Sequence, residues 1–186
     1  FTGFSETAVQ LEQYFKLYFG SDSVTSFHRQ KSQKEMHEAA DLFQNGPNCR
    51  FMICDESGGE GRNFQVADII VHADLPWSPA KVEQRIGRLD RIGRDPAKAV
   101  VSVVFYAEGT VEYDLFRLMQ EGLSIFTESL CGMEIVFGQL NETITEAFRA
   151  DVRFGLSNAI SEIASFAEMM RKEVEKERYF DLARQL

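Results

Sequence analysis

The fold is decided by residues 68–106, which read DIIVHADLPWSPAKVEQRIGRLDRIGRDPAKAVVSVVFY. The apolar runs at residues 68–73 and 99–106 predict two buried strands, and the second is rich in β-branched residues. Pro79 follows Ser78 at a position typical of a helix start, which predicts a helix from residue 79 to about 91. A strand, a helix and a strand at this spacing predict a parallel pair joined by a crossover helix.

The preceding residues repeat this alternation. Phe1–Phe4 is typical of the end of a strand, and a first residue other than Met indicates a piece of a longer polypeptide. Ser5 is expected to cap a helix that runs through Phe19. A second helix is expected over residues 30–43 and a strand over residues 49–54. Because these strands are almost continuously apolar, we expect an α/β, RecA-like parallel sheet with helices on both faces.

The pattern changes after residue 106. Residues 110–130 and 156–186 have apolar positions at helical spacing, and no strand is expected there. We therefore expect two parts, an α/β lobe over residues 1–106 and an α-helical C-terminal extension over residues 107–186. The extension packs on the lobe, or serves as a brace or a protein-binding arm.

The composition limits the function classes. No apolar run approaches the roughly 20 residues that a membrane helix needs, so no membrane partner is expected. Cys49, Cys54 and Cys131 have no CxxC spacing, which supports neither a zinc site nor a disulfide framework. Reduced thiols are typical of a cytoplasmic protein.

The net charge is −9, which by itself argues against a nucleic-acid-binding protein. The charge is uneven, however, because residues 106–186 hold 15 acidic against 8 basic side chains. Residues 81–98 instead hold six basic against three acidic side chains, so one face of the lobe is a candidate basic surface.

Two segments carry the candidate chemistry. Residues 55–64 form a glycine-rich loop after a predicted strand, where backbone amides can approach a phosphate closely. The alternative is a flexible surface turn. Residues 84–94 carry Arg at every third position, and the alternative there is a solvated basic face paired with Glu83 and Asp90. Both segments follow strands of one predicted sheet, so we expect them at the same edge, where such sheets bind ligands.

At these residues the chain resembles superfamily-two helicases. Gln84, Gly87, Arg88 and Arg91 match the arginine-bearing motif VI, and residues 57–64 resemble motif V. Phe1–Phe4 resembles the tail of motif IV. Residues 74–79, followed by 91–94, resemble the Swi/Snf pattern, in a form closest to bacterial RapA-like ATPases. Two departures are Ser78 in place of the usual Asn and Arg94 in place of the usual Gln.

The resemblance implies the second RecA-like lobe of an ATP-dependent translocase on double-stranded DNA. It implies that Arg88 and Arg91 act as arginine fingers on the ATP phosphates and that Gln84 helps to position them. The implied nucleotide-binding residues are Gly59, Glu60, Gly61 and Arg62. The implied nucleic-acid-binding residues are Ser57, Gly58 and Trp77, although Trp77 is as readily explained by core packing.

The first half of such a motor does not occur in these residues. There is no GxxxxGK[ST] phosphate loop and no Asp-Glu-x-His run, so no metal-binding residue is expected in this chain. ATP and Mg would be held mainly by an N-terminal RecA-like lobe. The parent protein is then expected to be an ATP hydrolase acting on nucleic acid, while this chain alone hydrolyses ATP undetectably.

The resemblance also implies partners and a location. The partners are double-stranded DNA, the N-terminal lobe, and RNA polymerase or another protein, and the location is the nucleoid in a bacterial cytoplasm. Two other interpretations stay open. The first is an inert RecA-like module that binds a protein through its helical extension, and the second is a helicase that separates strands.

Overall fold

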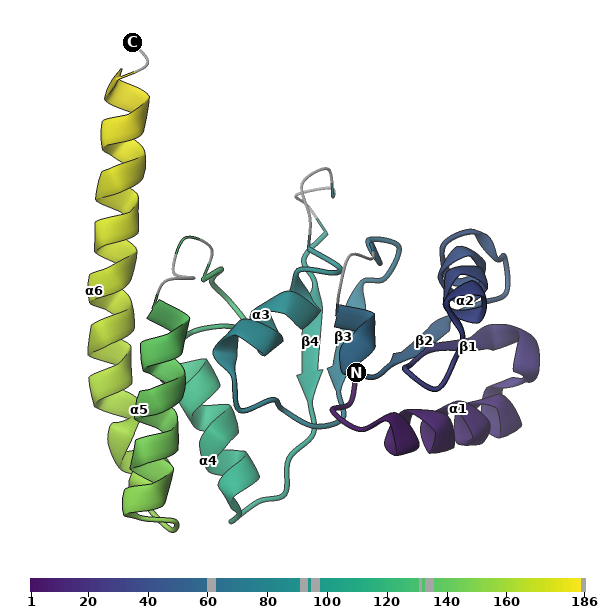
Figure 1. Cartoon of the computed structure of the whole chain (residues 1–186), viewed down its shortest axis with the longest axis horizontal. Helices are drawn as coiled ribbons and strands as arrows, with labels where there is room; N and C mark the ends of the chain where they lie inside the picture. Colours follow the sequence, from purple (N-terminus) through teal and green to yellow (C-terminus); the bar gives the residue numbers. More distant parts are fainter. Residues whose placement is uncertain (60–62, 91–93, 95–97, 131, 133–135, 185–186) are drawn as a thin grey trace. The chain divides into compact units, whose positions relative to one another are not determined.

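The computed structural model describes the whole chain except residues 60–62, 91–93, 95–97, 131, 133–135 and 185–186 (Figure 1). It forms two compact units. The first comprises Phe1–Leu75 and Gln84–Phe105, and the second comprises Pro76–Glu83 and Tyr106–Leu186. The boundary therefore crosses the chain three times and assigns residues 76–83 to the second, helical unit.

The first unit holds two pairs of parallel strands. Strand β1 (Val24–Phe27) pairs with β2 (Phe51–Cys54), and β3 (Ile69–His72) pairs with β4 (Val101–Val104). The register aligns Phe27 with Cys54 and His72 with Val104. The parallel arrangement predicted for residues 68–106 is confirmed, with strands shorter than the apolar runs. Strand β1 was not expected from the sequence.

Helix α1 (Ser5–Phe19) covers one face of the first strand pair. Its Ala8 forms a buried cluster with Val24 and Ile53. The predicted helix bounds are confirmed, but the prediction that Ser5 caps the helix is wrong. Phe4 precedes the helix, and the Ser5 hydroxyl donates to the buried carboxylate of Asp55 at 2.5 Å instead.

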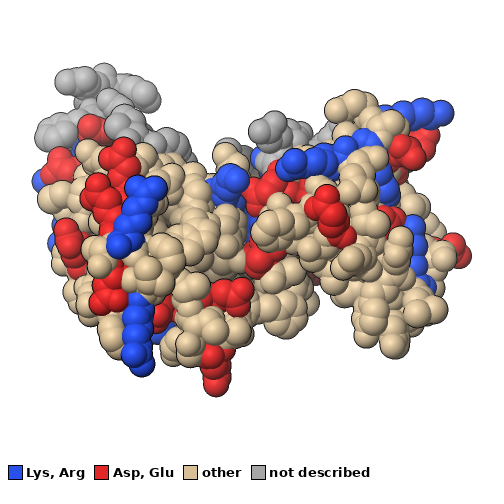
Figure 2. Space-filling view, turned by 60° about the horizontal axis from the view of Figure 1, so that its bottom comes forward, with Lys and Arg blue, Asp and Glu red and all other residues tan. Residues whose placement is uncertain are grey.

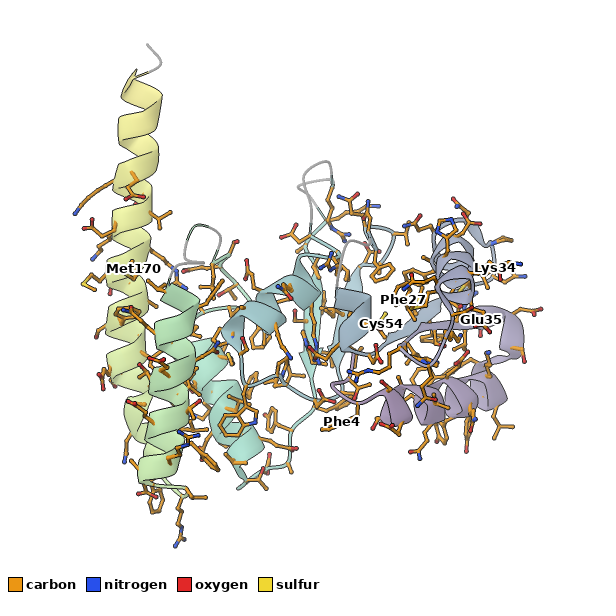
Figure 3. All side chains as sticks on the ribbon, viewed as in Figure 1. Phe4, Phe27, Lys34, Glu35, Cys54 and Met170 are labelled. Carbon is orange, nitrogen blue, oxygen red and sulfur yellow. The ribbon has the colours of Figure 1, made fainter. Side chains whose placement is uncertain are left out.

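Helix α2 (Gln33–Asn45) covers the opposite face of the same pair. Its Met36 and Ala40 pack against Phe27 and Cys54, which lie close together in Figure 3. Successive strand residues point to opposite faces, so one strand pair can contact both helices. The prediction of helices on both faces is confirmed for this pair.

Helix α2 begins three residues later than expected because Ser32 and Glu35 form a reciprocal capping box. The Ser32 hydroxyl accepts from the Glu35 amide, and the Glu35 carboxylate accepts from the Ser32 amide at 2.8 Å. This arrangement satisfies two of the backbone groups that a helix start leaves without partners. It defines the first turn of α2.

Helix α3 (Pro79–Ile86) begins at the predicted proline but ends about five residues earlier than expected. Gly87 has a low helix propensity, and residues 87–90 form turns. The Arg88 carbonyl accepts from the Phe64 amide at 2.9 Å, a contact outside any helix. Arg88 therefore follows α3 instead of lying on it.

The second unit is helical after residue 106, as expected. It contains α4 (Val111–Arg117), a π-helical turn η3 (Leu118–Gly122), α5 (Phe137–Ala150) and α6 (Gly155–Arg184). The helix expected over residues 110–130 thus ends at Gly122, and α5 was not expected. Helix α6 contacts η3, α5 and α4.

The core of the second unit is apolar, and its members come from every one of these helices. Leu115, Leu118, Met119, Leu140, Ile144, Ile163 and Ala167 are buried. On the face drawn in Figure 2, acidic and basic side chains are interspersed over this unit. None of the described helices combines the length and apolarity needed to span a bilayer.

Candidate functional site

The Arg85 side chain joins two loops at the carboxyl ends of the parallel strands. Its exposed fraction is 2%, and its Nη1 donates to the Asp74 carbonyl at 2.7 Å. Its Nη2 donates to Glu56 Oε1 at 2.5 Å and to Asp74 Oδ1 at 3.3 Å. Glu56 follows β2 and Asp74 follows β3. The glycine-rich loop and the arginine-bearing segment therefore meet at Arg85, although β2 and β3 belong to two separate strand pairs instead of the one sheet that was expected.

The Asp74 carboxylate extends this network to the first residues of the chain. It accepts from the Thr2 hydroxyl at 2.5 Å and from the Gly3 amide at 2.8 and 2.9 Å. Gly3 lies against this carboxylate, since a Cβ atom on it would be in van der Waals contact with Asp74 Oδ1 at 3.4 Å. The start of the chain, the loop after β3 and helix α3 are thus tied to one carboxylate.

The Asp55 carboxylate organises the first turn of the glycine-rich loop. It is fully buried and accepts from the Ser5 hydroxyl, from the Ser57 amide and hydroxyl, and from the Arg29 amide at 3.0 Å. Burial raises the pKa of this carboxyl, but these hydrogen bonds outweigh burial and hold the pKa below its usual value. Asp55 therefore remains charged and holds the start of the 3₁₀ turn η2 (Glu56–Gly59) in place.

His72 stands beside Arg85 at the end of β3 and is completely buried. Burial lowers the pKa of His72 to about 3, with the positive charge of Arg85 acting in the same direction. The imidazole is neutral at physiological pH. It does not add a positive charge to this edge of the sheet.

The three predicted catalytic residues differ in how exposed they are and in whether the structure describes them. Gln84 is on α3 with an exposed side chain. Arg88 has an exposed fraction of 9%, and its Nε is buried. Arg91 lies outside the described residues. The structure thus places Gln84 and Arg88 at the end of α3, next to the Arg85 network in sequence.

The predicted nucleotide-binding and nucleic-acid-binding residues are described only in part. Ser57, Gly58 and Gly59 are in η2, and the Ser57 hydroxyl is engaged by Asp55. Residues 60–62 (Glu60, Gly61 and Arg62) lie outside the described residues. Trp77 belongs to the second unit, where it is 41% exposed and its ring contacts Phe148 edge-on at a centroid distance of 4.9 Å.

Arg94 is the residue whose role the sequence did not indicate. Its Nη1 donates to the carbonyls of Gln65 and Ala67, both at 2.9 Å, and its Nη2 donates to Asp68 Oδ1 at 2.8 Å. Its Nε donates to the Lys98 carbonyl at 2.9 Å. Arg94 therefore ties the segment after the arginine repeat to the residues that lead into β3.

Sequence reasoning also missed Asp55 and Asp74 as organising residues. Both directly follow strands, which was the available signal, but a carboxylate at a strand end is equally common as a solvated loop residue. Among the described residues, no group of three or more His, Cys, Asp and Glu side chains is arranged to hold a metal ion.

Comparison with known proteins gives a consistent family. Residues 2–93 match the family described as "Helicase conserved C-terminal domain". The RNA polymerase-associated protein RapA of Vibrio vulnificus (strain YJ016) is 36% identical over 176 residues, which cover 94% of this chain and 18% of that protein. RapA of Vibrio cholerae serotype O1 (strain M66-2) is 36% identical over 172 residues, covering 92% of this chain and 17% of that protein. The chain thus spans less than a fifth of these relatives.

A solved structure shares the fold. The C-terminal part of the Fun30 ATPase domain superposes with a TM-score of 0.55 at 17% sequence identity, covering 78% of this chain and 46% of that chain. At this identity the similarity establishes the fold alone. It agrees with an α/β, RecA-like arrangement followed by helices.

Proposed function

Through residues 2–93 the chain belongs to the helicase conserved C-terminal domain family, in its Swi/Snf-type, RapA-like form, and we propose that it is the second motor lobe of an ATP-dependent translocase on double-stranded DNA. Membership of this family by itself gives a helicase-like lobe. Movement on duplex DNA and the roles of individual residues belong to the proposal.

One observation carries the proposal. The Arg85–Glu56 ion pair holds together the glycine-rich loop, which follows β2, and the end of α3, which follows β3, at the carboxyl ends of the two parallel strand pairs. Ligands of open parallel sheets bind at this edge, beyond the carboxyl ends of the strands. A nucleotide shared with a second lobe would meet both the loop amides and the guanidinium groups there.

Arg88 and Arg91 are the proposed arginine fingers, with Gln84 as a positioning residue. In phosphoryl transfer, negative charge spreads over the oxygens of the γ-phosphoryl group, and a guanidinium aimed at them stabilises the transition state. The Arg85 network supports this role because it holds the end of α3, from which the following arginines continue, next to Glu56 of the glycine-rich loop.

The two faces of the glycine-rich loop are proposed to serve different ligands. Gly59, Glu60, Gly61 and Arg62 would contact the nucleotide, and Ser57 and Gly58 would approach the DNA backbone. Trp77 would couple nucleotide and DNA binding. The hydrogen bonds from Ser57 to Asp55 support a rigid loop start, which is a requirement for precise backbone contacts.

The motor would be completed by other partners. ATP with Mg supplies the phosphoryl group, and an N-terminal RecA-like lobe would hold most of both. The helical extension would bind RNA polymerase or another protein, in keeping with the name of the RapA relatives. Such a protein would work on DNA in a bacterial cytoplasm.

The test is DNA-stimulated ATP hydrolysis by the longer protein that contains this chain. Arg91→Ala is expected to lower kcat by roughly a thousandfold while the unfolding midpoint is unchanged. Arg88→Lys, which keeps the charge of a largely covered side chain, is expected to lower kcat almost as far. Arg117→Ala, at an exposed pair with Glu121, is the matched control and keeps full turnover. Full turnover in Arg91→Ala would remove the finger role.

The burial of Arg88 favours a second candidate, an inert RecA-like module that binds a protein through its helices. In this candidate, the buried Arg88 side chain contributes to stability instead of catalysis. This candidate predicts that the longer protein neither hydrolyses ATP nor loses any function on Arg91→Ala. The same measurements therefore separate the two candidates.

A further inference from the structure

Helices α5 and α6 run side by side in opposite directions within the second unit (Figure 1). The turn that joins them is ordered, because the Asp151 carboxylate accepts from the Arg153 and Phe154 amides at 2.9 and 3.0 Å. Gly155 begins α6 so close to α5 that a Cβ atom on it would overlap the Ala147 carbonyl oxygen. The surface between the two helices is therefore fixed before any ligand binds.

A hollow of about 400 Å³ opens on this surface, and we name it the α5–α6 groove. Its apolar lining comes from both helices, with Leu140 from α5 and Ile163 and Phe166 from α6. Leu140 and Ile163 are buried, while the Phe166 side chain is half-buried. A ligand in the groove can therefore remove apolar surface from water, which favours binding.

Three glutamates also line the groove, and all are exposed: Glu142 and Glu146 of α5 and Glu162 of α6. Within the described part of the chain, none of them forms a hydrogen bond or an ion pair through its side chain. By contrast, each of four other glutamates in this unit pairs with a Lys or an Arg: Glu121, Glu128, Glu168 and Glu173. The groove thus carries negative charge that the described residues do not neutralise.

The stability of α5 does not account for this charge. Glu142 and Glu146 stand one turn apart, and like charges at this spacing destabilise a helix. Arg149 follows in the next turn, but it does not line the groove, and among the described contacts it forms no ion pair with Glu146. A cationic ligand would relieve the repulsion that α5 otherwise retains.

The chemistry of the groove selects among ligands. A single metal ion is a poor fit, since among the described residues no three His, Cys, Asp or Glu side chains are grouped to hold one. Duplex DNA is a poor fit as well, because carboxylates repel its phosphates. Carboxylates on both walls and an apolar floor match an amphipathic helix that carries Lys or Arg beside a row of apolar side chains.

We propose that the α5–α6 groove binds a basic amphipathic helix of a protein partner. Its apolar row contacts Leu140, Ile163 and Phe166, and its cationic groups pair with the three groove glutamates. The lining residues of α5 run from Gln139 to Glu146, which is about 10 Å along an α-helix, so about three turns of the partner helix fill the groove. This assigns a place and a partner chemistry to the protein binding proposed above for the helical extension, and it rests on that part of the proposed function alone.

The test is fluorescence anisotropy with the longer protein that contains this chain. The probe is a labelled peptide of about four helical turns, with leucine on one face and lysine on both flanks. Glu142→Gln, Glu146→Gln and Glu162→Gln in one variant are expected to weaken its binding at least about tenfold, since each exposed charge pair contributes a factor of roughly two to five. This groove variant is expected to keep its unfolding midpoint, because it also removes the repulsion between Glu142 and Glu146.

A matched variant controls for the overall charge. Glu168→Gln, Glu173→Gln and Glu175→Gln on α6 remove the same number of charges, and none of these residues lines the groove. We expect this variant to change the affinity for the probe less than about twofold. Equal weakening in the two variants would reduce the interaction to the attraction between an acidic protein and a basic peptide, and the proposal would be lost.

A second probe tests the apolar floor. Replacing every leucine of the peptide by serine keeps its charge and is expected to weaken binding at least about fivefold, because apolar surface is then no longer buried. Equal affinity of the two peptides would overturn the proposal, and so would a leucine peptide that does not bind. Self-association of the protein that the groove variant abolishes would assign the groove to a second copy, which also contradicts the proposal.

The binding assay contains neither ATP nor DNA. Its outcome is therefore independent of the turnover measured for Arg91→Ala. The proposed motor role can fail while the groove binds its helix, and the groove can fail while the motor role holds.

Discussion

Arg85 Nη2 lies 2.5 Å from Glu56 Oε1, and this contact connects helix α3 to the glycine-rich loop after β2. The pair is shielded, since only 3% of the Arg85 side chain and 23% of the Glu56 side chain are exposed. A shielded ion pair at this place fixes the relative position of the two segments that carry the proposed nucleotide contacts. It connects the stability of the lobe to the geometry of its site.

Arg85→Met is expected to destabilise the chain by about 3–5 kcal/mol, because it leaves Glu56 and Asp74 without their shared cation. Denaturant unfolding measures the loss. Arg117→Met is the control, since its ion pair with Glu121 is exposed to solvent and contributes little to stability. A loss for Arg85→Met no larger than that of the control would show that the network does not hold the lobe together.

Arg94→Gln introduces the residue usual in the family and is expected to cost about 2 kcal/mol. Gln cannot reach the carbonyls of Gln65 and Ala67 and the Asp68 carboxylate at once, as Arg94 does. Thermal unfolding checks the loss, and Arg94→Lys should recover only part of it. An unchanged midpoint would contradict the proposed tie between this segment and β3.

His72 predicts a loss of stability on mild acidification. Its pKa is lowered to about 3 in the folded chain, whereas in the unfolded chain it is near 6.5. The unfolded state therefore binds the extra proton as the pH falls below 6.5, and stability declines toward pH 3. Between pH 6.5 and 4.5 this single group accounts for about 2–3 kcal/mol.

The measurement is the free energy of unfolding as a function of pH, compared between the unchanged chain and His72→Leu. The variant is expected to show a flatter profile between pH 6.5 and 4.5, because it has no imidazole to protonate on unfolding. Parallel profiles for the two proteins would show that His72 is free to protonate in the folded state.

The 186-residue chain by itself is expected to show no detectable ATP hydrolysis with or without duplex DNA. It carries no phosphate-loop sequence, so the proposed fingers would have no bound triphosphate to contact. A phosphate-release assay on the purified chain checks this, with the longer protein as the positive control. Turnover by the chain that Arg91→Ala abolishes would show that one lobe suffices.

Several elements could be predicted from the sequence because their signals are local. The apolar runs of β3 and β4 predicted parallel strands, and Pro79 predicted the start of α3. The bounds of α1 were correct. Strand β1 was not predicted because two of its four residues, Thr25 and Ser26, are polar. These residues are buried in the structure because α1 and α2 cover the strand.

Among the predictions that were wrong, the predicted end of α3 lies closest to the site. The three-residue spacing of the arginines suggested one continuous helix, and the alternative hydrogen bond from Phe64 to the Arg88 carbonyl is not visible in sequence. The sequence identified Arg85 only as one of four arginines at three-residue spacing. Its burial, and its division between Glu56 and Asp74, required the coordinates.

The order of motif-bearing segments along the chain was determined by the sequence alone, and it is enough to establish the family and the α/β fold. The tertiary structure decided that Arg85 is internal and is shared between Glu56 and Asp74. The physical reason is that a guanidinium finds its carboxylate through contacts between residues far apart in sequence. Arg85 meets Glu56 across 29 positions of the chain, and no local pattern encodes that encounter.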